Sequence, residues 1–465
     1  MRHATHLPAR LKTLTLLTLL AITPVALAET LDFDLAVQRA LTQNPDIAVA
    51  GTQISHAQAA VKQSEGARLP KLTASLNATR TDDALNAFGL KLSQRNATFN
   101  DFGAGEFNPS NPDVLSVAPA NLNHPDPVNN FNARLEAQLP LYTGGLIEGY
   151  NAQARAYLRA AQHGDVMARQ KVVFDVLRAY EGVHAARAYA EVARQGRAAA
   201  ESYVKTIDNL LKGGVVVKSD LLTAKVHLED IKVQQAQAEN AVQQALDQLH
   251  LLLGMPLSAP LDVGGSVEVR PLDGKLADYQ DDALKSNPGL AALRSQMDAA
   301  QAAIKVARAG KYPQAGLLAR LDTNDNTLGF DAHSYTVGGQ VSWQFYDGGA
   351  TDGAIQRALA SRDELAAKLS QAEMGVAYQV ADAWRHADEA QLRVSARELA
   401  VSQAEEAQRI VEKRYASGVT TVTELLAAQA QLDKARADLV AARYDLKVQR
   451  ASARLASGRL QPDQL

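Results

Sequence analysis

The chain has 465 residues, a formal net charge of −3, 5% aromatic side chains and no cysteine. The lack of cysteine excludes disulfide bonds, thiolate metal sites, a nucleophilic thiol and a lipid anchor on cysteine. The acidic balance argues against nucleic acid as a partner, because phosphate binding needs a basic surface.

Residues 1–28 have the pattern of a secretory signal peptide. Arg2, Arg10 and Lys12 precede an apolar run from Leu14 to Ile22, and Ala26-Leu27-Ala28 resembles a cleavage site. Removal of this segment takes away three positive charges and moves the net charge from −3 to −6. No later stretch is long and apolar enough to predict a transmembrane helix, so insertion into a membrane would require strands.

The rest of the chain is a tandem duplication. Asn44-Pro45 recurs 243 residues later as Asn287-Pro288, and Gly144-Gly145 recurs 204 residues later as Gly348-Gly349. The difference between 243 and 204 is an insertion of 39 residues in the first copy. We therefore divide the mature chain into two structural repeats, residues 29–262 and 263–465.

Each repeat is predicted to begin with a helix, from about Leu31 to Gly66 in the first copy and from about Leu276 to Ala309 in the second. The Asn-Pro pair inside each segment should break it into a short and a longer helix, because proline cannot continue a helix across its own position.

Four segments with alternating apolar and polar residues follow, two in each repeat. They are Leu72–Thr79, Asn132–Tyr142, Gln314–Leu321 and Tyr335–Phe345. A period of two indicates strands with one apolar face, and their length and terminal aromatic residues match tilted membrane strands. The alternative is a soluble pair of hairpins with one face on a core, but few bulky residues elsewhere could form that core.

Four strands cannot close a barrel, and an open strand edge cannot face lipid. Membrane insertion of these strands therefore predicts an oligomer that pools strands from several chains. The inserted residues lie within about 82–130, are rich in Asn, Pro, Gly and Asp, and show no periodicity. We expect them to form a long external loop, because the long loops of outer-membrane barrels face outward.

Two very long helices are predicted, from about Leu146 to Leu211 and from Ala350 to Tyr415, each followed by a glycine-containing turn and a returning helix. In the second returning helix, leucine recurs every seven residues from Leu425 to Leu446, beside a stripe of alanines. This spacing is typical of a coiled coil with closely packed backbones.

The order of these features resembles the TolC family of outer-membrane efflux proteins. The resemblance is carried by the two Asn-Pro pairs, by Leu139-Pro140-Leu141-Tyr142-x-Gly144-Gly145 with its repeat at Phe345–Gly349, and by Arg414-Tyr415-x-x-Gly418-x5-Glu424-Leu425-Leu426. It implies a mixed α and β membrane protein in the Gram-negative outer membrane. Three copies would share a transmembrane β-barrel and extend long helical hairpins into the periplasm as an α-barrel. It also implies docking to a periplasmic adaptor and an inner-membrane transporter.

In this family the periplasmic tip is closed by polar contacts between the two helical turns and by acidic residues facing the bore. By resemblance, the corresponding positions are Ser219 and Asp220 on the first turn and Tyr415, Thr420 and Glu424 on the second. The family pattern has arginine where Thr420 stands and a second acidic residue where Ala427 stands. We expect closure to depend mainly on a Tyr415–Asp220 hydrogen bond.

No catalytic, cofactor or metal site is predicted. The histidines on helical segments, His184, His227, His250 and His386, lack a carboxylate at convincing ligand spacing. The sequence from Asp322 to Asn326 lacks the glycine and terminal glutamate of a calcium loop, and we expect it to be the polar turn of the second hairpin.

Two functions are compatible with these features. The first is a passive outer-membrane exit duct for efflux or type I secretion, and the second is a soluble periplasmic coiled-coil scaffold or adaptor. The alternating strands favour the duct. An enzyme ranks third, because no nucleophile lies beside a base.

Overall fold

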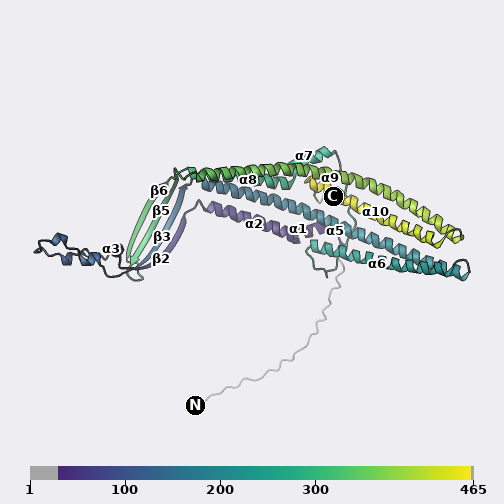
Figure 1. The fold of residues 1–465 in the computed structure, drawn as a ribbon, viewed down its shortest axis with the longest axis horizontal. Helices are drawn as coiled ribbons and strands as arrows, with labels where there is room; N and C mark the ends of the chain where they lie inside the picture. The colour runs from purple at the N-terminus through teal and green to yellow at the C-terminus, as the bar shows by residue number, and fades with distance from the viewer. Residues whose placement is uncertain (1–29, 462–465) are drawn as a thin grey trace, which may run out of the picture.

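The structure is a computed structural model that describes residues 30–461. The predicted signal peptide lies outside the described residues. The molecule is elongated, with a four-stranded sheet near one end and two long helical hairpins that turn at the other (Figure 1).

The long helices lie where the sequence predicts them. Helices α5 and α9 are each 67 residues long, which corresponds to about 100 Å at 1.5 Å per residue. No helix within residues 30–461 has the length and apolar character needed to cross a membrane. The main helices are α1 (Phe33–Gln43), α2 (Pro45–Gly66), α5 (Leu146–Lys212), α6 (Lys218–Leu252), α7 (Leu276–Ser286), α8 (Pro288–Arg308), α9 (Ala350–Ala416) and α10 (Val422–Ala456).

The Asn-Pro pairs separate α1 from α2 and α7 from α8, as predicted. Each asparagine caps the longer helix: the side chain of Asn44 accepts a hydrogen bond from the backbone of Asp46 at 2.8 Å, and that of Asn287 accepts one from Gly289 at 2.9 Å. Each proline occupies the first helical position, where a missing N–H costs nothing.

The four predicted strands form one antiparallel sheet in the order β2-β3-β5-β6. Their bounds are β2 (Lys71–Thr81), β3 (Val128–Tyr142), β5 (Gln314–Asp325) and β6 (Ala332–Ser342). The last strand thus begins and ends three residues earlier than predicted, and Trp343 and Phe345 lie in the connection to α9. Strands β2 and β6 form the edges and have no outer neighbour within the described chain.

The sheet has one apolar and one mainly polar face, as the alternation predicts. The paired residues Leu76 and Ala133, and Ala319 and Val337, lie on the apolar face. Val337 on this face is 72% exposed in the single chain. The opposite face carries Lys71, Thr73, Ser75, Asn77, Asn130, Asn132, Arg134, Glu136, Gln138, Arg320, Asp322, Asn324, Thr336 and Gln340.

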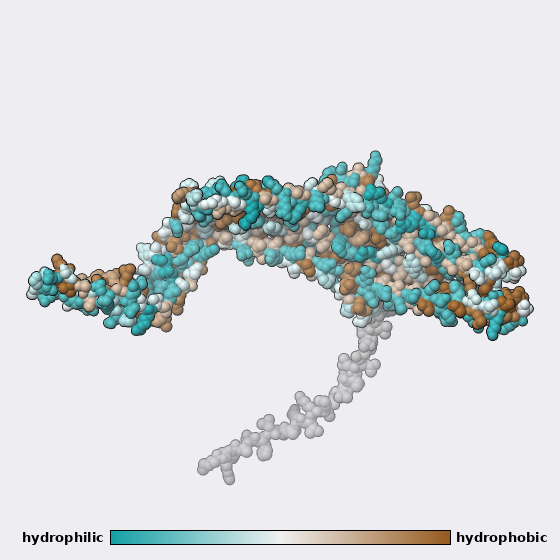
Figure 2. All heavy atoms as spheres, viewed as in Figure 1, coloured by the Kyte–Doolittle hydropathy of each residue, from teal (hydrophilic) through white to brown (hydrophobic). Residues whose placement is uncertain are grey.

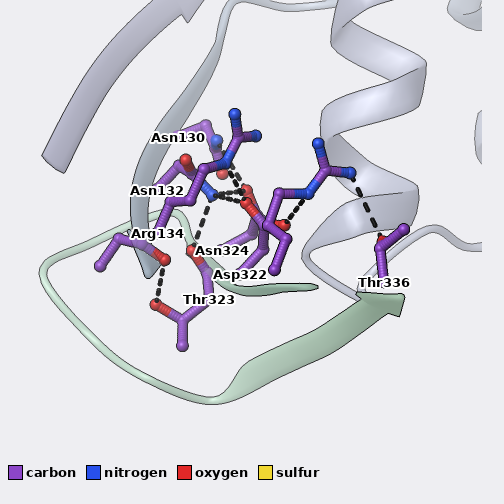
Figure 3. A network of polar contacts seen from close by, with 9 residues as sticks. Asn130, Asn132, Arg134, Asp322, Thr323, Asn324 and Thr336 are labelled. Carbon is purple, nitrogen blue, oxygen red and sulfur yellow. Dashed lines mark hydrogen bonds and ion pairs between the residues drawn. The ribbon is translucent and has the colours of Figure 1, made fainter. Parts of the chain in front are cut away.

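A polar network crosses this face between β3 and β5 (Figure 3). The carboxylate of Asp322, only 6% exposed, pairs with Arg134 at 2.7 Å and Arg320 at 2.8 Å. Asn132 donates to Asn324 at 3.2 Å. The prediction of a turn at Asp322–Asn326 is therefore wrong: residues up to Asp325 belong to β5, because the side chains of Asp322, Thr323 and Asn324 have partners on β3.

The insertion between β2 and β3 lies beyond the sheet, at the opposite end of the molecule from the helical turns (Figure 1). It contains helix α3 (Ala84–Ser93) and a short helix α4 (Ala120–Asn123), so the expectation of a loop without periodic structure is wrong for its first part. Asp83 caps α3, and the buried side chain of Gln94 donates to the backbone of Asn129 at 2.7 Å.

The largest core lies midway along the helices. Strand β1 (Thr30–Leu31) pairs in parallel with β4 (Asp262–Val263), and both pack near α1 and the middle of α5. The ring of Tyr180 on α5 is fully buried there, and its hydroxyl lies 3.1 Å from the carbonyl oxygens of Leu31 and Gly265. This core fixes α5 at the level from which the two hairpins extend.

Candidate functional site

The candidate site is the pair of helical turns at the end of the molecule away from the sheet (Figure 1). We call the α5–α6 unit hairpin 1, the α9–α10 unit hairpin 2, and this end the tip. Gly214 and Gly418, 204 residues apart, have φ angles of 76° and 72° in the two turns. This left-handed conformation favours glycine and lets each helix reverse.

Apolar side chains are exposed at the tip. Hydrophobic residues gather at this end of the surface in Figure 2, where Val215, Val217 and Val419 are 62%, 62% and 66% exposed. Beneath them, Ile207 and Leu425 are almost fully buried in a cluster shared by the two hairpins. The hairpins therefore pack against each other through an apolar core just above the turns.

Ser219 and Asp220 lie in the first turn of α6. Ser219 is exposed and Asp220 is half-buried. Neither side chain caps α6, whose N-cap residue, Val217, makes no side-chain bond. Asp220 still stabilises this helix end, because a carboxylate in the first turn complements the helix dipole.

Tyr415 lies in the last turn of α9 and is 6% exposed. Its hydroxyl has no hydrogen-bond partner in the described part of the chain. Burial raises the pKa of Tyr415, and the nearby negative charge of Asp220 raises it further. The predicted Tyr415–Asp220 hydrogen bond is therefore wrong for this conformation, although the two groups lie close enough for Asp220 to act on Tyr415 electrostatically.

Thr420 and Glu424 lie on either side of the start of α10. The hydroxyl of Thr420 donates to the carboxylate of Glu424. Thr421 caps the helix, since its hydroxyl accepts from the backbone N–H of Glu424 at 3.3 Å. The Glu424 side chain is thus not the cap of α10, and it remains exposed at the tip.

The structure reveals a polar junction that the sequence did not identify. Gln408 on α9 donates to the hydroxyl of Tyr203 on α5 at 2.6 Å, and this hydroxyl donates to the side-chain oxygen of Gln429 on α10 at 3.0 Å. The amide of Gln429 then donates to Asp433 at 2.9 Å. We call these four residues the inter-hairpin junction. Its only sequence signal is the pair of polar residues four apart within the leucine and alanine seam of α10.

The two central residues of the junction are buried. Tyr203 and Gln429 are 7% and 5% exposed, and burial, followed by the charge of Glu412, raises the pKa of Tyr203 to about 12. Tyr203 therefore stays neutral at physiological pH and can act as both donor and acceptor. A buried hydrogen-bonded chain of this kind fixes the position of hairpin 2 on hairpin 1.

Two histidines on helical segments, His250 and His184, lie in different environments. Both ring nitrogens of His250 lie within 2.9 Å of backbone carbonyls. Nε2 of His184 is buried and has no hydrogen-bond partner among residues 30–461. Among residues 30–461, no three His, Cys, Asp or Glu side chains are arranged to hold a metal ion. The tip carries exposed acidic and apolar side chains, among them Glu424 and Val419.

Known proteins share this architecture. The family model of outer membrane efflux proteins matches residues 36–255 and 280–459. The chain is 24% identical over 433 residues to the outer membrane protein TolC of Vibrio cholerae, covering 91% of this chain and 89% of that relative. It is 27% identical over 298 residues to the alkaline protease secretion protein AprF of Pseudomonas aeruginosa. That alignment covers 62% of this chain and 62% of AprF, which is less than two thirds of its length.

Solved structures agree on the fold. CusC superposes with a TM-score of 0.76 at 18% identity, covering 92% of each chain. The outer membrane channel MtrE of Neisseria gonorrhoeae, solved in an open state, gives a TM-score of 0.73 at 18% identity, covering 93% of this chain and 90% of that one. The match to the family model and to the curated relatives excludes the alternative of a soluble periplasmic scaffold. The chain belongs to the outer membrane efflux protein family, and it is a protein of the Gram-negative outer membrane with a helical part that extends into the periplasm.

Proposed function

We propose that three copies of this chain form the exit duct of a tripartite efflux or type I secretion system. In this proposal the strands of the trimer close one barrel in the outer membrane, and the helices continue it as a tunnel. The duct is passive and carries what a periplasmic adaptor and an inner-membrane transporter deliver to it.

The main support for the proposal is that both edge strands of the sheet are unpaired on their outer sides in the described part of the single chain. Strands β2 and β6 lack an outer neighbour within the described chain, and unpaired backbone groups at an edge are not tolerated in lipid. Because neighbouring strands alternate in direction, β6 of one chain runs antiparallel to β2 of the next. Copies can therefore continue the sheet without breaking its pattern, and three of them supply enough strands for a closed barrel.

The two faces of the sheet support the same arrangement. The apolar face, which includes Leu72, Leu76 and Val337, would contact lipid, and the face with Arg134, Arg320 and Asp322 would line the bore. Buried in the bore wall, Asp322 neutralises much of the charge of both arginines. The polar face therefore suits a water-filled passage rather than a binding site for one ion.

The names of two relatives indicate what kinds of substance such ducts export. One relative is a secretion protein for alkaline protease and another an outer membrane protein for pyoverdine export. These cargoes differ greatly in size, which fits a duct whose substrate is chosen by the transporter. We accordingly propose no specific cargo for this chain.

We further infer that the tip is the closable end of the duct. Ser219, Asp220, Tyr415, Thr420 and Glu424 all lie within one turn of helix from the two reversals. Three copies would place three exposed Glu424 carboxylates around one axis, and such a ring attracts cations and disfavours anions in a narrow bore.

Single-channel recordings of the purified trimer in planar bilayers test this function. The wild type is expected to conduct with a preference for cations, and Glu424→Gln should weaken both that preference and block by multivalent cations added on the tip side. Glu229→Gln is the matched control, because Glu229 is exposed on the shaft of hairpin 1 and pairs with Lys232. A trimer that does not conduct, or equal selectivity in all three proteins, would contradict the proposal.

A further inference from the structure

A half-buried carboxylate lies between the two hairpins, well above the tip. Asp433 is the end of the inter-hairpin junction on α10, and one of its oxygens lies against the backbone of α5 at Gly196. A Cβ atom at Gly196 would come within 3.0 Å of the Asp433 Oδ2 atom. The absence of a side chain at Gly196 thus provides the space into which hairpin 2 inserts this carboxylate.

The equivalent position in the other repeat has a different environment. Glu229, 204 residues before Asp433, is on α6, and its side chain is 69% exposed and paired with Lys232 at 2.8 Å. The position equivalent to Gly196 is Ala400. One acidic side chain at this register is therefore hydrated on the outside of its helix, and the other is half-buried at a contact between the hairpins.

Few groups compensate the charge of Asp433. On its own helix, Gln429 donates to it at 2.9 Å and Arg436 exerts a favourable charge, while His227 faces it from α6. Arg436 is itself engaged by Glu405 at 2.9 Å on α9 and by Gln195 at 3.2 Å on α5. Burial outweighs these contacts and raises the pKa of Asp433 above its ordinary 3.8.

We propose that Asp433 links the packing of the two hairpins to proton concentration: hairpin 2 lies closely against hairpin 1 when Asp433 is protonated and separates more readily when it is ionised. This inference rests on the proposed function, in which separation of the hairpins opens the tip. The junction couples the two events, because one movement of α10 away from α5 both breaks the Tyr203–Gln429 hydrogen bond and exposes Asp433 to water.

The direction of the effect follows from linkage. In separated hairpins Asp433 is hydrated and titrates near its ordinary value of 3.8, whereas in packed hairpins the pKa is raised. The packed state therefore binds the proton more tightly, and the extra stability is fully present below 3.8 and is lost as pH rises through the raised value. Acidic pH therefore favours close packing of the two hairpins at the tip, and neutral pH favours their separation.

Distances between the hairpins provide the test. The chain has no cysteine, so Lys212→Cys and Ser417→Cys, both at exposed turns, can carry the two spin labels without background. One labelled chain is assembled with unlabelled chains into each full-length trimer, and pulsed electron paramagnetic resonance is recorded from pH 8 to pH 4. The short-distance population is expected to grow as pH falls, with a midpoint above 3.8.

Three variants separate Asp433 from other groups. Asp433→Asn keeps an acceptor for Gln429 and should hold the short distance at every pH, while Glu229→Gln should titrate like the wild type. Gly196→Ala should displace the carboxylate toward water and move the midpoint down. If the distance in Asp433→Asn still changes with pH as it does in the wild type, the inference is wrong. If the change of distance with pH disappears in His227→Gln, the inference is also wrong, because the titrating group would then be the imidazole of His227.

The measurement is independent of conduction. A trimer whose hairpin distance titrates as described but which passes no current contradicts the proposed duct and leaves the link at Asp433 intact. A conducting trimer whose distance does not respond to pH contradicts the link alone. If Asp433→Asn does not assemble, Gly196→Ala still tests the inference, because an unchanged midpoint in that variant would contradict it.

Discussion

Asn44 and Asn287 make the same two contacts in the two halves of the chain. Besides capping its own helix, Asn44 donates to the carbonyl of Leu252 at 3.0 Å and Asn287 donates to that of Ala456 at 3.3 Å. The two donors are 243 residues apart and the two acceptors 204, the same spacings as in the sequence repeat. Each asparagine thus joins the start of its repeat to the end of that repeat's returning helix, which supports the proposed division into residues 29–262 and 263–465.

Replacement of these asparagines should destabilise the helical part. Asn44→Ala removes a cap and leaves the carbonyl of Leu252 without its donor, and we expect a loss of about 1–3 kcal/mol in unfolding free energy. Asn287→Ala should cost less, because Asn287 is more exposed than Asn44. Denaturant unfolding followed by circular dichroism measures both, with the exposed Asn240→Ala on α6 as control. A stability of Asn44→Ala equal to that of the control would contradict this role.

The two faces of β6 should respond differently to a charge. Val337 lies near the middle of the strand on the apolar face, so Val337→Arg should impair assembly, at a cost of about 2–4 kcal/mol for each chain at the membrane midplane. Gln340 lies on the polar face opposite Gly316, where an arginine has room, and Gln340→Arg should assemble with altered conductance. Trimer yield from outer membranes measures the difference, and equal yields would show that the faces are assigned wrongly.

The insertion should be external and dispensable for folding. Asn111 lies in its irregular part, between α3 and α4. An epitope inserted beside Asn111 is expected to bind antibody on intact cells without loss of trimer. Protection of the epitope until the outer membrane is broken would invert the proposed topology.

Tyr415→Phe should not open the tip. The hydroxyl of Tyr415 is buried and has no hydrogen-bond partner within the described residues in this conformation, so its removal deletes an unsatisfied group and keeps the apolar packing. We expect an open probability equal to or below that of the wild type in single-channel recordings. Tyr415→Ala, which empties the cluster around Leu425, should raise it. A higher open probability in Tyr415→Phe would mean that the hydroxyl helps to hold the tip closed in the assembled channel.

Much of this fold could be predicted because its elements are long and periodic. The helix breaks at Asn44 and Asn287 follow from proline chemistry, and the alternation around Val337 sets the faces of β6. The strand ends were less well predicted, because pairing across the sheet and not local pattern decides them. Asp322 is an example: it pairs with Arg134 and Asn132 on β3, and β5 therefore extends into the polar segment that was expected to form a turn.

The tip residues were located through family resemblance, but their contacts were not. Whether Tyr415 bonds to Asp220 depends on the relative position of two hairpins that are far apart in sequence. The junction around Tyr203 was missed for the same reason, because its four residues come from three helices. The need for glycine at position 196 could not be predicted from the sequence, because it depends on the contact with Asp433 on another helix.

The central claim, that neighbouring chains pair through β2 and β6, is tested most directly by cross-linking in outer membranes. Val337→Cys on β6 is combined in turn with cysteine at Leu72, Ala74, Leu76 or Ala78, which share the apolar face of β2, in a chain that has no other cysteine. We expect at least one pair to yield a covalent trimer on oxidation, while each single variant does not. Assembly into the outer membrane without a covalent trimer for any of the four pairs would contradict it.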